Sequence, residues 1–223
     1  MTPRTERRSV AGLVGPIEVA LDAPTGTASG IALIGHPHPL YGGTLDNKVA
    51  ATLARAFASL GLLAVRPNFR GVGASAGTHD HGNGETEDFL HLIAHAADWF
   101  GVPAGVVALS GFSFGSFVAA RAAERLQAQG RAVQHLVLVG SAAGKWAMPG
   151  VAPHTLIVHG EYDETIPLAD VLAWARPQDL PVIVLPGADH FFHRRLSILK
   201  RLVVNHVTAQ RTLAGSSEVD ASG

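Results

Sequence analysis

The sequence contains no cysteine, and it has few charged and aromatic residues. Without cysteine, the 223-residue chain cannot form a disulfide, bind a metal through thiolates or use a cysteine nucleophile. Charged residues make up 16% of the chain and aromatic residues 6%, and the formal net charge is −1. The isoelectric point near 6.9 gives no basic character that would attract nucleic acid or an anionic membrane. We therefore expect neither as a partner.

Long hydrophobic runs are also absent. No stretch approaches the roughly 18 consecutive apolar residues that indicate a membrane-spanning helix. The basic start, Met1 to Arg8, is not followed by the sustained apolar core of a signal peptide. We therefore expect a cytoplasmic protein. Its length and its 47% of hydrophobic residues suit one well-buried domain over residues 1–211, followed by a disordered tail over residues 212–223.

Short apolar runs alternate with amphipathic segments along the chain. The runs predict strands at residues 10–14, 16–21, 30–35, 62–65, 106–109, 135–139, 155–158 and 182–185. Helices are expected at residues 85–99, 116–128, 166–175 and 192–210, and one more, capped by Thr44 or Asp46, is expected to end near Leu60. The first two runs read as a hairpin around Gly15. This alternation predicts an α/β fold, a doubly wound, mostly parallel sheet with helices on both faces.

The pentapeptide Gly111-Phe112-Ser113-Phe114-Gly115 has the pattern G-x-S-x-G, between a strand-like run and a helix-like segment. In this context the pattern indicates a nucleophile elbow, a strained turn that exposes the serine hydroxyl above the sheet. The flanking glycines are expected because the strand and helix backbones approach too closely for a Cβ atom. A serine at such a turn can also be an ordinary helix cap, but the context favours Ser113 as a nucleophile.

A serine nucleophile needs a histidine base and an orienting carboxylate, and both residue types follow predicted strands later in the chain. Asp163 stands in the loop after the run 155–158, and His190 follows the run 182–185. Functional residues of open α/β sheets collect at the carboxyl ends of strands. The order serine, acid, histidine therefore predicts a Ser113–Asp163–His190 triad. Other acids and a second histidine nearby are interpreted as surface or helix residues: Glu161, Glu164, Asp189 and His193.

Acyl transfer also needs N–H donors directed at the oxyanion of its tetrahedral intermediate. Phe114, directly after the nucleophile, is expected to provide one backbone N–H. The second is expected from the loop 36–43, whose two prolines have no N–H. His38 is our first choice for that donor and Leu40 the next, whereas Tyr41 could instead line the acyl pocket or donate its hydroxyl.

Twelve histidines raise the alternative of a metal site. The closest pairs are His36 with His38 and His79 with His81. Both lie in flexible or proline-rich context, and no cluster of carboxylates converges on them in the sequence. We therefore expect no metal and no other cofactor.

The chain resembles the α/β-hydrolase superfamily from about Gly30 to Val207. More closely, it is similar to a group of small bacterial esterases and dienelactone-hydrolase-like proteins, through the segments HPHPLYGGTLDNKV, RPNFRGVGASAG, GFSFGSFVAAR, HGEYDETIP and GADHFF. The resemblance implies the triad above and esterase activity, with serine where dienelactone hydrolases proper use cysteine. About 15 residues separate the runs 135–139 and 155–158, where a cap domain would normally be inserted. We expect a cap-less fold with an open site that suits small substrates.

Together these features predict a serine carboxylesterase that hydrolyses small or short-acyl esters through an acyl-enzyme. Its expected partner is a small-molecule ester, and the protein is expected to be a monomer or homodimer. Apolar residues that could form the pocket wall, or simply pack in the core, are Tyr41, Phe112, Phe114, Trp146 and Phe191. One alternative is an acyltransferase or peptidase with the same triad. Another is a hydrolase fold kept as a non-catalytic binding module, which would have no need of a strained elbow.

Overall fold

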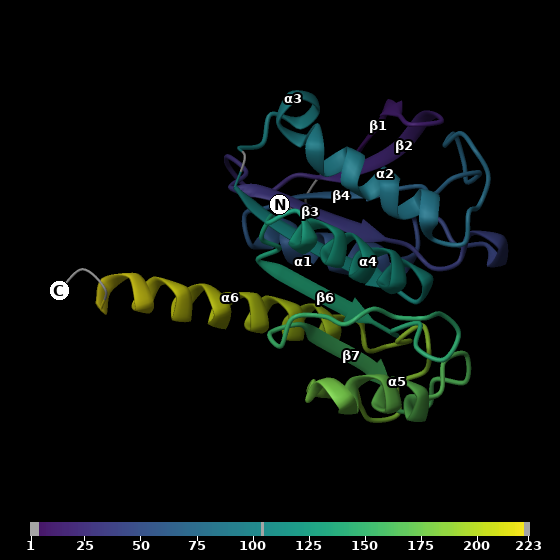
Figure 1. Cartoon of the computed structure of the whole chain (residues 1–223), viewed down its shortest axis with the longest axis vertical. Coiled ribbons are helices and arrows are strands. Elements are labelled where there is room, and N and C mark those ends of the chain that lie inside the picture. Colours follow the sequence, from purple (N-terminus) through teal and green to yellow (C-terminus); the bar gives the residue numbers. More distant parts are fainter. Residues whose placement is uncertain (1–4, 104, 221–223) are drawn as a thin grey trace.

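The computed structural model describes residues 5–103 and 105–220, the last seven of these as backbone only (Figure 1). Eight strands form one sheet in the order β1-β2-β4-β3-β5-β6-β7-β8. The strands are β1 (Thr5–Gly12), β2 (Gly15–Asp22), β3 (Gly30–Gly35), β4 (Leu63–Pro67), β5 (Val106–Phe112), β6 (His135–Val139), β7 (Leu156–Gly160) and β8 (Val182–Leu185). β1 and β2 are antiparallel at one edge, and all pairs from β4 to β8 are parallel. The predicted mostly parallel sheet is confirmed.

Helices cover both faces of the sheet, as the alternation predicts (Figure 1). They are α1 (Lys48–Ser59), α2 (Asn83–Ala94), α3 (Ala96–Phe100), α4 (Phe114–Ala128), α5 (Leu168–Ala175) and α6 (Leu196–Asp220), with 3₁₀ turns η1 (Pro39–Tyr41) and η2 (Arg176–Gln178). On one face α1 and α6 pack against each other, and on the other α2 packs against α4. Each pair encloses its own apolar core with the sheet between them, around Phe57 on one side and Phe89 on the other.

The central strands are buried on both faces. Every residue of β3 and β4 is buried, because helices cover the sheet above and below. This burial explains why these strands are nearly continuous apolar runs in the sequence. The carboxyl ends of the parallel strands meet at one edge, where the loops after β3, β5, β7 and β8 carry the predicted site residues.

Several helix boundaries differ from the prediction. The side chain of Asn47 caps α1, accepting the N–H groups of Val49 and Ala50, so neither Thr44 nor Asp46 is the cap. The segment expected as one helix is divided at His95 into α2 and α3.

The last helix starts and ends later than the sequence indicates. It begins at Leu196, because Phe192 and Arg194 have positive φ angles of 55° and 60° that a helix cannot contain. It continues to Asp220, through the segment expected to be disordered, where no proline interrupts it. Residues 221–223 of the expected tail lie outside the described residues. Over residues 5–103 and 105–220, no helix has both the length and the apolar character needed to cross a membrane.

Candidate active site

Ser113 lies at the turn between β5 and α4, and its backbone is left-handed. Its φ of 55° and ψ of −123° are angles that a residue with a Cβ atom rarely adopts. A hydrogen bond of 2.9 Å from its N–H to the carbonyl of Val139, at the end of β6, holds the turn. The side chain makes no capping hydrogen bond to α4, in contrast to the helix-cap alternative. The strained turn therefore leaves the Ser113 hydroxyl without a hydrogen bond to the helix that follows it.

The glycines of the pentapeptide allow three backbone segments to pack directly together. A Cβ atom added at Gly111 would lie 2.0 Å from the carbonyl oxygen of Gly115. One added at Gly115 would lie 2.3 Å from the carbonyl oxygen of Gly35, the last residue of β3. No side chain fits at these distances, so the start of α4 can approach the ends of β3 and β5 only with glycine at both positions.

Asp163 and His190 form a buried hydrogen-bonded pair in the loops after β7 and β8. Nδ1 of His190 is 2.7 Å from Oδ2 of Asp163. Oδ1 accepts the N–H groups of Thr165 at 2.9 Å and Ile166 at 2.8 Å. Burial would raise the pKa of Asp163, but the hydrogen bonds from His190 and Ile166 outweigh it and hold this pKa below its ordinary value. The ionised carboxylate favours the tautomer of His190 with its proton on Nδ1.

His190 also lies beside the elbow. Its ring packs on that of Phe112, the residue before Ser113, with centroids 4.8 Å apart. A Cβ atom added at Gly140, directly after β6, would lie 3.5 Å from Cε1 of His190. The hydroxyl of Ser113 has no hydrogen-bond partner among the described residues, so it is not bonded to Nε2 of His190 in this conformation. In unliganded enzymes this bond often forms only with substrate.

The neighbouring acids make other contacts. The carboxylate of Glu161 accepts the N–H of Gly187 at 2.8 Å. Asp189 is hydrogen bonded to His193, at 2.5 Å from its Nδ1, on the exposed surface of the loop. Asp163 is therefore the acid that the fold brings to His190.

The loop after β3 is fixed by His36, whose imidazole is fully buried. Its Nε2 accepts the N–H of Phe69 at 3.0 Å, so Nδ1 carries the proton and donates to the carbonyl of Pro37 at 2.6 Å. Burial lowers the pKa of His36 to about 4. Both ring nitrogens therefore hold the loop, and neither is available as a metal ligand.

The backbone N–H groups of this loop differ in availability. The N–H of Leu40 donates to Nδ1 of His38 at 3.2 Å, and the N–H of Tyr41 donates to the carbonyl of His38 at 3.1 Å. The N–H groups of His38 and Phe114 have no acceptor within the part of the chain that the structure describes. The rings of these two residues lie 5.0 Å apart. His38 and Phe114 are thus the open pair of donors, and Leu40 is not.

A cavity of about 540 Å³ opens beside Ser113. Four rings contribute to its wall: those of His38, Tyr41, Phe114 and Trp146. The ring of Trp146 lies 5.0 Å from that of Phe114 and 5.7 Å from that of His38. The remaining lining residues, which the sequence analysis did not identify as pocket residues, are Ala142, Lys145, Glu164, Thr165 and Ile166. They lie in the loops after the carboxyl ends of β6 and β7. Functional residues of open α/β sheets collect at these ends, so the rule that predicted Asp163 could also have indicated these five residues.

Phe112 and Phe191 lie elsewhere than the expected pocket wall. Phe112 is fully buried below His190, because residues alternate in direction along a strand and this one turns into the core of α1 and α6. Phe191 is half exposed and lines a separate cavity of about 490 Å³ near the start of α1. Its ring is 5.1 Å from that of His190, so it borders the candidate site from another side.

The second histidine pair lies close to the aromatic wall. Nδ1 of His79 is 3.1 Å from Oε1 of the buried Glu85, and its ring is 5.0 Å from that of His81 and 5.2 Å from that of Phe114. Over the described ranges, no group of three or more histidine or acidic side chains is arranged to hold a metal ion.

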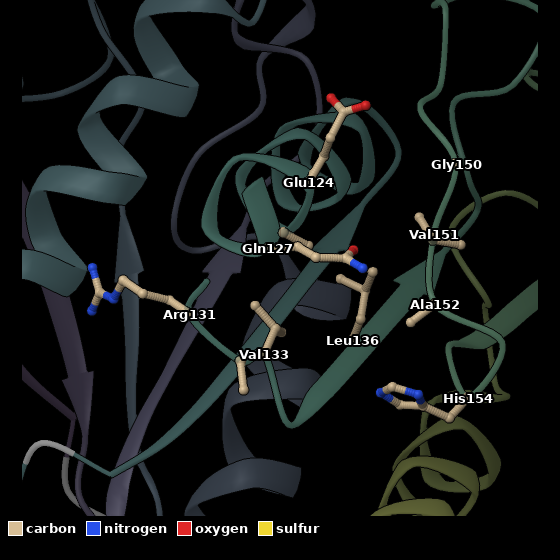
Figure 2. Close-up of a pocket in the computed structure, with 11 residues that line it drawn as sticks. Glu124, Gln127, Arg131, Val133, Leu136, Gly150, Val151, Ala152 and His154 are labelled. Atoms are coloured by element: carbon tan, nitrogen blue, oxygen red, sulfur yellow. The ribbon is translucent and has the colours of Figure 1, made fainter. Parts of the chain in front are cut away.

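Figure 2 shows a smaller cavity, of about 220 Å³, lined by Gln127 of α4, by Leu136 near the start of β6 and by His154. Ser113 instead follows the carboxyl end of β5, at the other end of the parallel strands. No predicted site residue lines the cavity of Figure 2, so it is separate from the candidate active site.

Comparison with known proteins identifies related hydrolases. A thioesterase-domain family matches residues 68–151, the segment that contains the elbow. The chain is similar to an α/β serine hydrolase without a lid from Xanthomonas campestris, at 34% identity over 92% of this chain and 94% of that chain, with a TM-score of 0.83. It is also similar to an α/β serine hydrolase homologue from Coxiella burnetii, at 39% identity over 90% and 96% of the two chains, with a TM-score of 0.77.

A further relative is an uncharacterized protein of Rickettsia prowazekii, 28% identical over 212 residues, which are 88% of this chain and 86% of that protein. The two solved structures exceed 30% identity over at least nine-tenths of the chain. On this basis the chain belongs to the α/β-hydrolase superfamily, in its lid-less form, and it is a hydrolase.

Proposed function

We propose that this hydrolase is a serine carboxylesterase acting through Ser113, Asp163 and His190. The Ser113 hydroxyl adds to the ester carbonyl while Nε2 of His190 takes its proton. The intermediate then collapses, the proton passes from His190 to the departing alcohol, and an acyl-Ser113 remains. Water next attacks the acyl carbon and gives a proton to His190, which returns it to Ser113 as the carboxylic acid leaves. Asp163 keeps the imidazole in the required tautomer.

The buried Asp163–His190 hydrogen bond is the observation that supports this proposal most directly, because it leaves Nε2 of His190 as the only ring nitrogen able to accept a proton. The open N–H groups of His38 and Phe114 supply the pair of donors that the oxyanion requires. Loss of one such donor typically lowers kcat by about 10² to 10³-fold.

Small or short-acyl esters are the substrates that the entrance favours. At the mouth of the cavity Tyr41 is 87% exposed, and the neighbouring Leu40 is 70% exposed. Between β6 and β7 the chain contains no helix or strand that could close over the site. A long acyl chain would therefore extend beyond the cavity and leave part of its length exposed to water.

Thioester hydrolysis is a second candidate, favoured by the thioesterase-domain match over residues 68–151. It uses the same acyl-enzyme with a thiol as the leaving group. Hydrolysis of an oxygen ester and a thioester with the same acyl group would separate the two, because a thioesterase should have the higher kcat/KM for the thioester. Peptide hydrolysis and acyl transfer also use this triad, and matched amides and added alcohol acceptors test them.

The deciding experiment measures hydrolysis of p-nitrophenyl esters from acetate to palmitate by the wild type and by Ser113→Ala. We expect activity on short chains in the wild type and a loss of roughly 10⁶-fold in kcat in the variant. A fluorophosphonate probe should label the wild type at Ser113 only. Activity that survives in a folded Ser113→Ala protein would mean that another residue is the nucleophile. A wild type that neither hydrolyses nor becomes labelled would favour the binding-module alternative.

A further inference from the structure

Next to the Asp163 carboxylate lies another histidine, which the catalytic scheme above does not use. His159 belongs to β7 and its side chain is fully buried. Its Nε2 is 2.9 Å from the carbonyl oxygen of Ile166 and 3.4 Å from Oδ2 of Asp163. Oδ2 is the same oxygen that Nδ1 of His190 contacts.

The contacts of His159 define its tautomer. A carbonyl oxygen can only accept, so Nε2 carries the proton and Nδ1 does not. Nδ1 is buried without a partner in the described part of the chain. Burial lowers the pKa of His159, although the carbonyl of Ile166 and the charge of Asp163 oppose this, and His190 adds to it. An unpaired buried nitrogen costs stability that an apolar side chain would not, so the N–H on the other nitrogen is the feature that explains a histidine here.

We propose that His159 is a positioning residue for the Asp163–His190 pair, a role that rests on the function proposed above. Two backbone N–H groups hold Oδ1 of Asp163, whereas among the described residues only His190 and His159 have a polar atom beside Oδ2. The Nε2–H of His159 donates to the Ile166 carbonyl at 2.9 Å, and the same nitrogen lies 3.4 Å from Oδ2, so the positive end of the N–H dipole attracts this oxygen and restrains the rotation of the carboxylate. It thereby keeps Oδ2 directed at Nδ1 of His190. Ile166 lines the cavity beside Ser113, so the same contact fixes the cavity wall.

Two substitutions separate the N–H donor from the bulk of the side chain. His159→Gln retains a donor, because the amide nitrogen of glutamine can occupy the position of imidazole Nε2. His159→Leu fills similar space without any donor. His135→Leu is the matched control: His135 is also buried, but it lies at the start of β6 and contacts Gln210 at 2.7 Å, away from the site.

Kinetics over pH give the first readout. We expect His159→Leu to lower kcat about 10- to 100-fold with little change in KM, by analogy with the removal of residues that orient the ligands of metal sites. The acid limb of kcat/KM should move to lower pH, because a carboxylate that turns away no longer stabilises the imidazolium of His190. His159→Gln should remain close to the wild type in both quantities. His135→Leu should lower the melting temperature without moving the acid limb.

A second readout needs no substrate. The low-field proton resonance of the His190 Nδ1–H bonded to Asp163 should be present in the wild type and His159→Gln and lost in His159→Leu. If His159→Leu does not fold, His159→Asn replaces it, because its shorter amide does not reach Oδ2 of Asp163. A leucine variant that keeps the wild-type kcat, acid limb and resonance would overturn the proposal. A glutamine variant as impaired as the leucine variant would also overturn it. If the wild type hydrolyses no ester but the resonance follows this pattern, the positioning role stands and only the esterase proposal fails.

Discussion

A single buried imidazole connects the loop after β3 to the segment after β4. His36 makes this connection through Phe69 and Pro37, and it does so only as the neutral ring, because Nε2 must accept. Proton uptake at His36 therefore opposes folding. His36 is thus a titratable side chain that supports the loop carrying His38, the candidate oxyanion donor.

We expect the free energy of unfolding to fall as the pH decreases from 6.5 to 4. In the unfolded chain His36 takes up a proton near its ordinary pKa of 6.5, but in the folded protein only near 4, so the unfolded state binds more protons in this window. The difference amounts to about 3 kcal/mol. Urea denaturation at pH 7 and pH 4 measures it.

His36→Asn should be less stable at pH 7 and should lose less stability on acidification. If the free energy of unfolding of this variant falls with pH as steeply as that of the wild type, His36 is not the responsible group. Part of the pH dependence should remain in the variant, because burial also lowers the pKa of His135 and His159.

The close approach at the elbow is the other effect at the scale of single residues. Gly115→Ala would place a Cβ atom 2.3 Å from the carbonyl oxygen of Gly35 and force α4 away from β3. We expect a loss of at least about 3 kcal/mol in the free energy of unfolding. Gly150→Ala is the control, since its nearest neighbour is a side-chain oxygen of Gln178 at 3.4 Å, and its loss should stay below about 0.5 kcal/mol. Equal melting temperatures for the two variants would contradict this account.

At the scale of elements, strands were easier to predict than helix ends. β3 and β4 are buried on both faces, and burial favours the nearly continuous apolar runs that the sequence displays. The start of α1 depends on which polar side chain reaches the first free N–H groups of the helix. Thr44, Asp46 and Asn47 are all residue types that can cap a helix. Only the path of the chain after β3 selects Asn47.

This choice of cap gives a testable difference. Asn47→Ala should lower the free energy of unfolding by about 1 kcal/mol, because two N–H groups at the start of α1 lose their acceptor. Thr44→Ala, which removes a single bond of 3.3 Å to the N–H of Asp46, should cost less than about 0.5 kcal/mol. Thermal or urea unfolding compares them, and a larger loss for Thr44→Ala would restore Thr44, one of the two caps that the sequence predicted.

For the whole molecule, the sequence predicted the residues that the fold brings together but only part of the cavity wall, namely Tyr41, Phe114 and Trp146. Asp163 and His190 could be predicted because chain order and strand ends determine which loops share an edge of the sheet. Phe112 and Phe191 were wrongly predicted to line the cavity. The direction of the Phe112 side chain depends on which residues of β5 face each side of the sheet, and that of Phe191 depends on the backbone angles near Phe192. Lys145 and Glu164 reach the cavity through loops whose course the sequence does not determine.

The attachment of α6 gives a prediction at this scale. Leu199, Val203 and Val207 bury this helix against the sheet and α1, whereas Leu213 is 72% exposed. A chain ended after Leu213 should therefore keep its free energy of unfolding within about 1 kcal/mol. Leu199→Ala should lose about 3 kcal/mol. Urea unfolding tests both, and strong destabilisation by the truncation would mean that the end of α6 contributes to folding.

Trp146 makes the cavity wall visible to spectroscopy. Its indole is partly buried, stacks on Phe117 with centroids 5.2 Å apart and lines the cavity beside Ser113. The other two tryptophans, Trp99 and Trp174, do not line this cavity. With both replaced by phenylalanine, the tryptophan fluorescence of the protein would come from the cavity wall alone. In a Ser113→Ala background such a protein would report the binding of any candidate ester without a chromogenic leaving group.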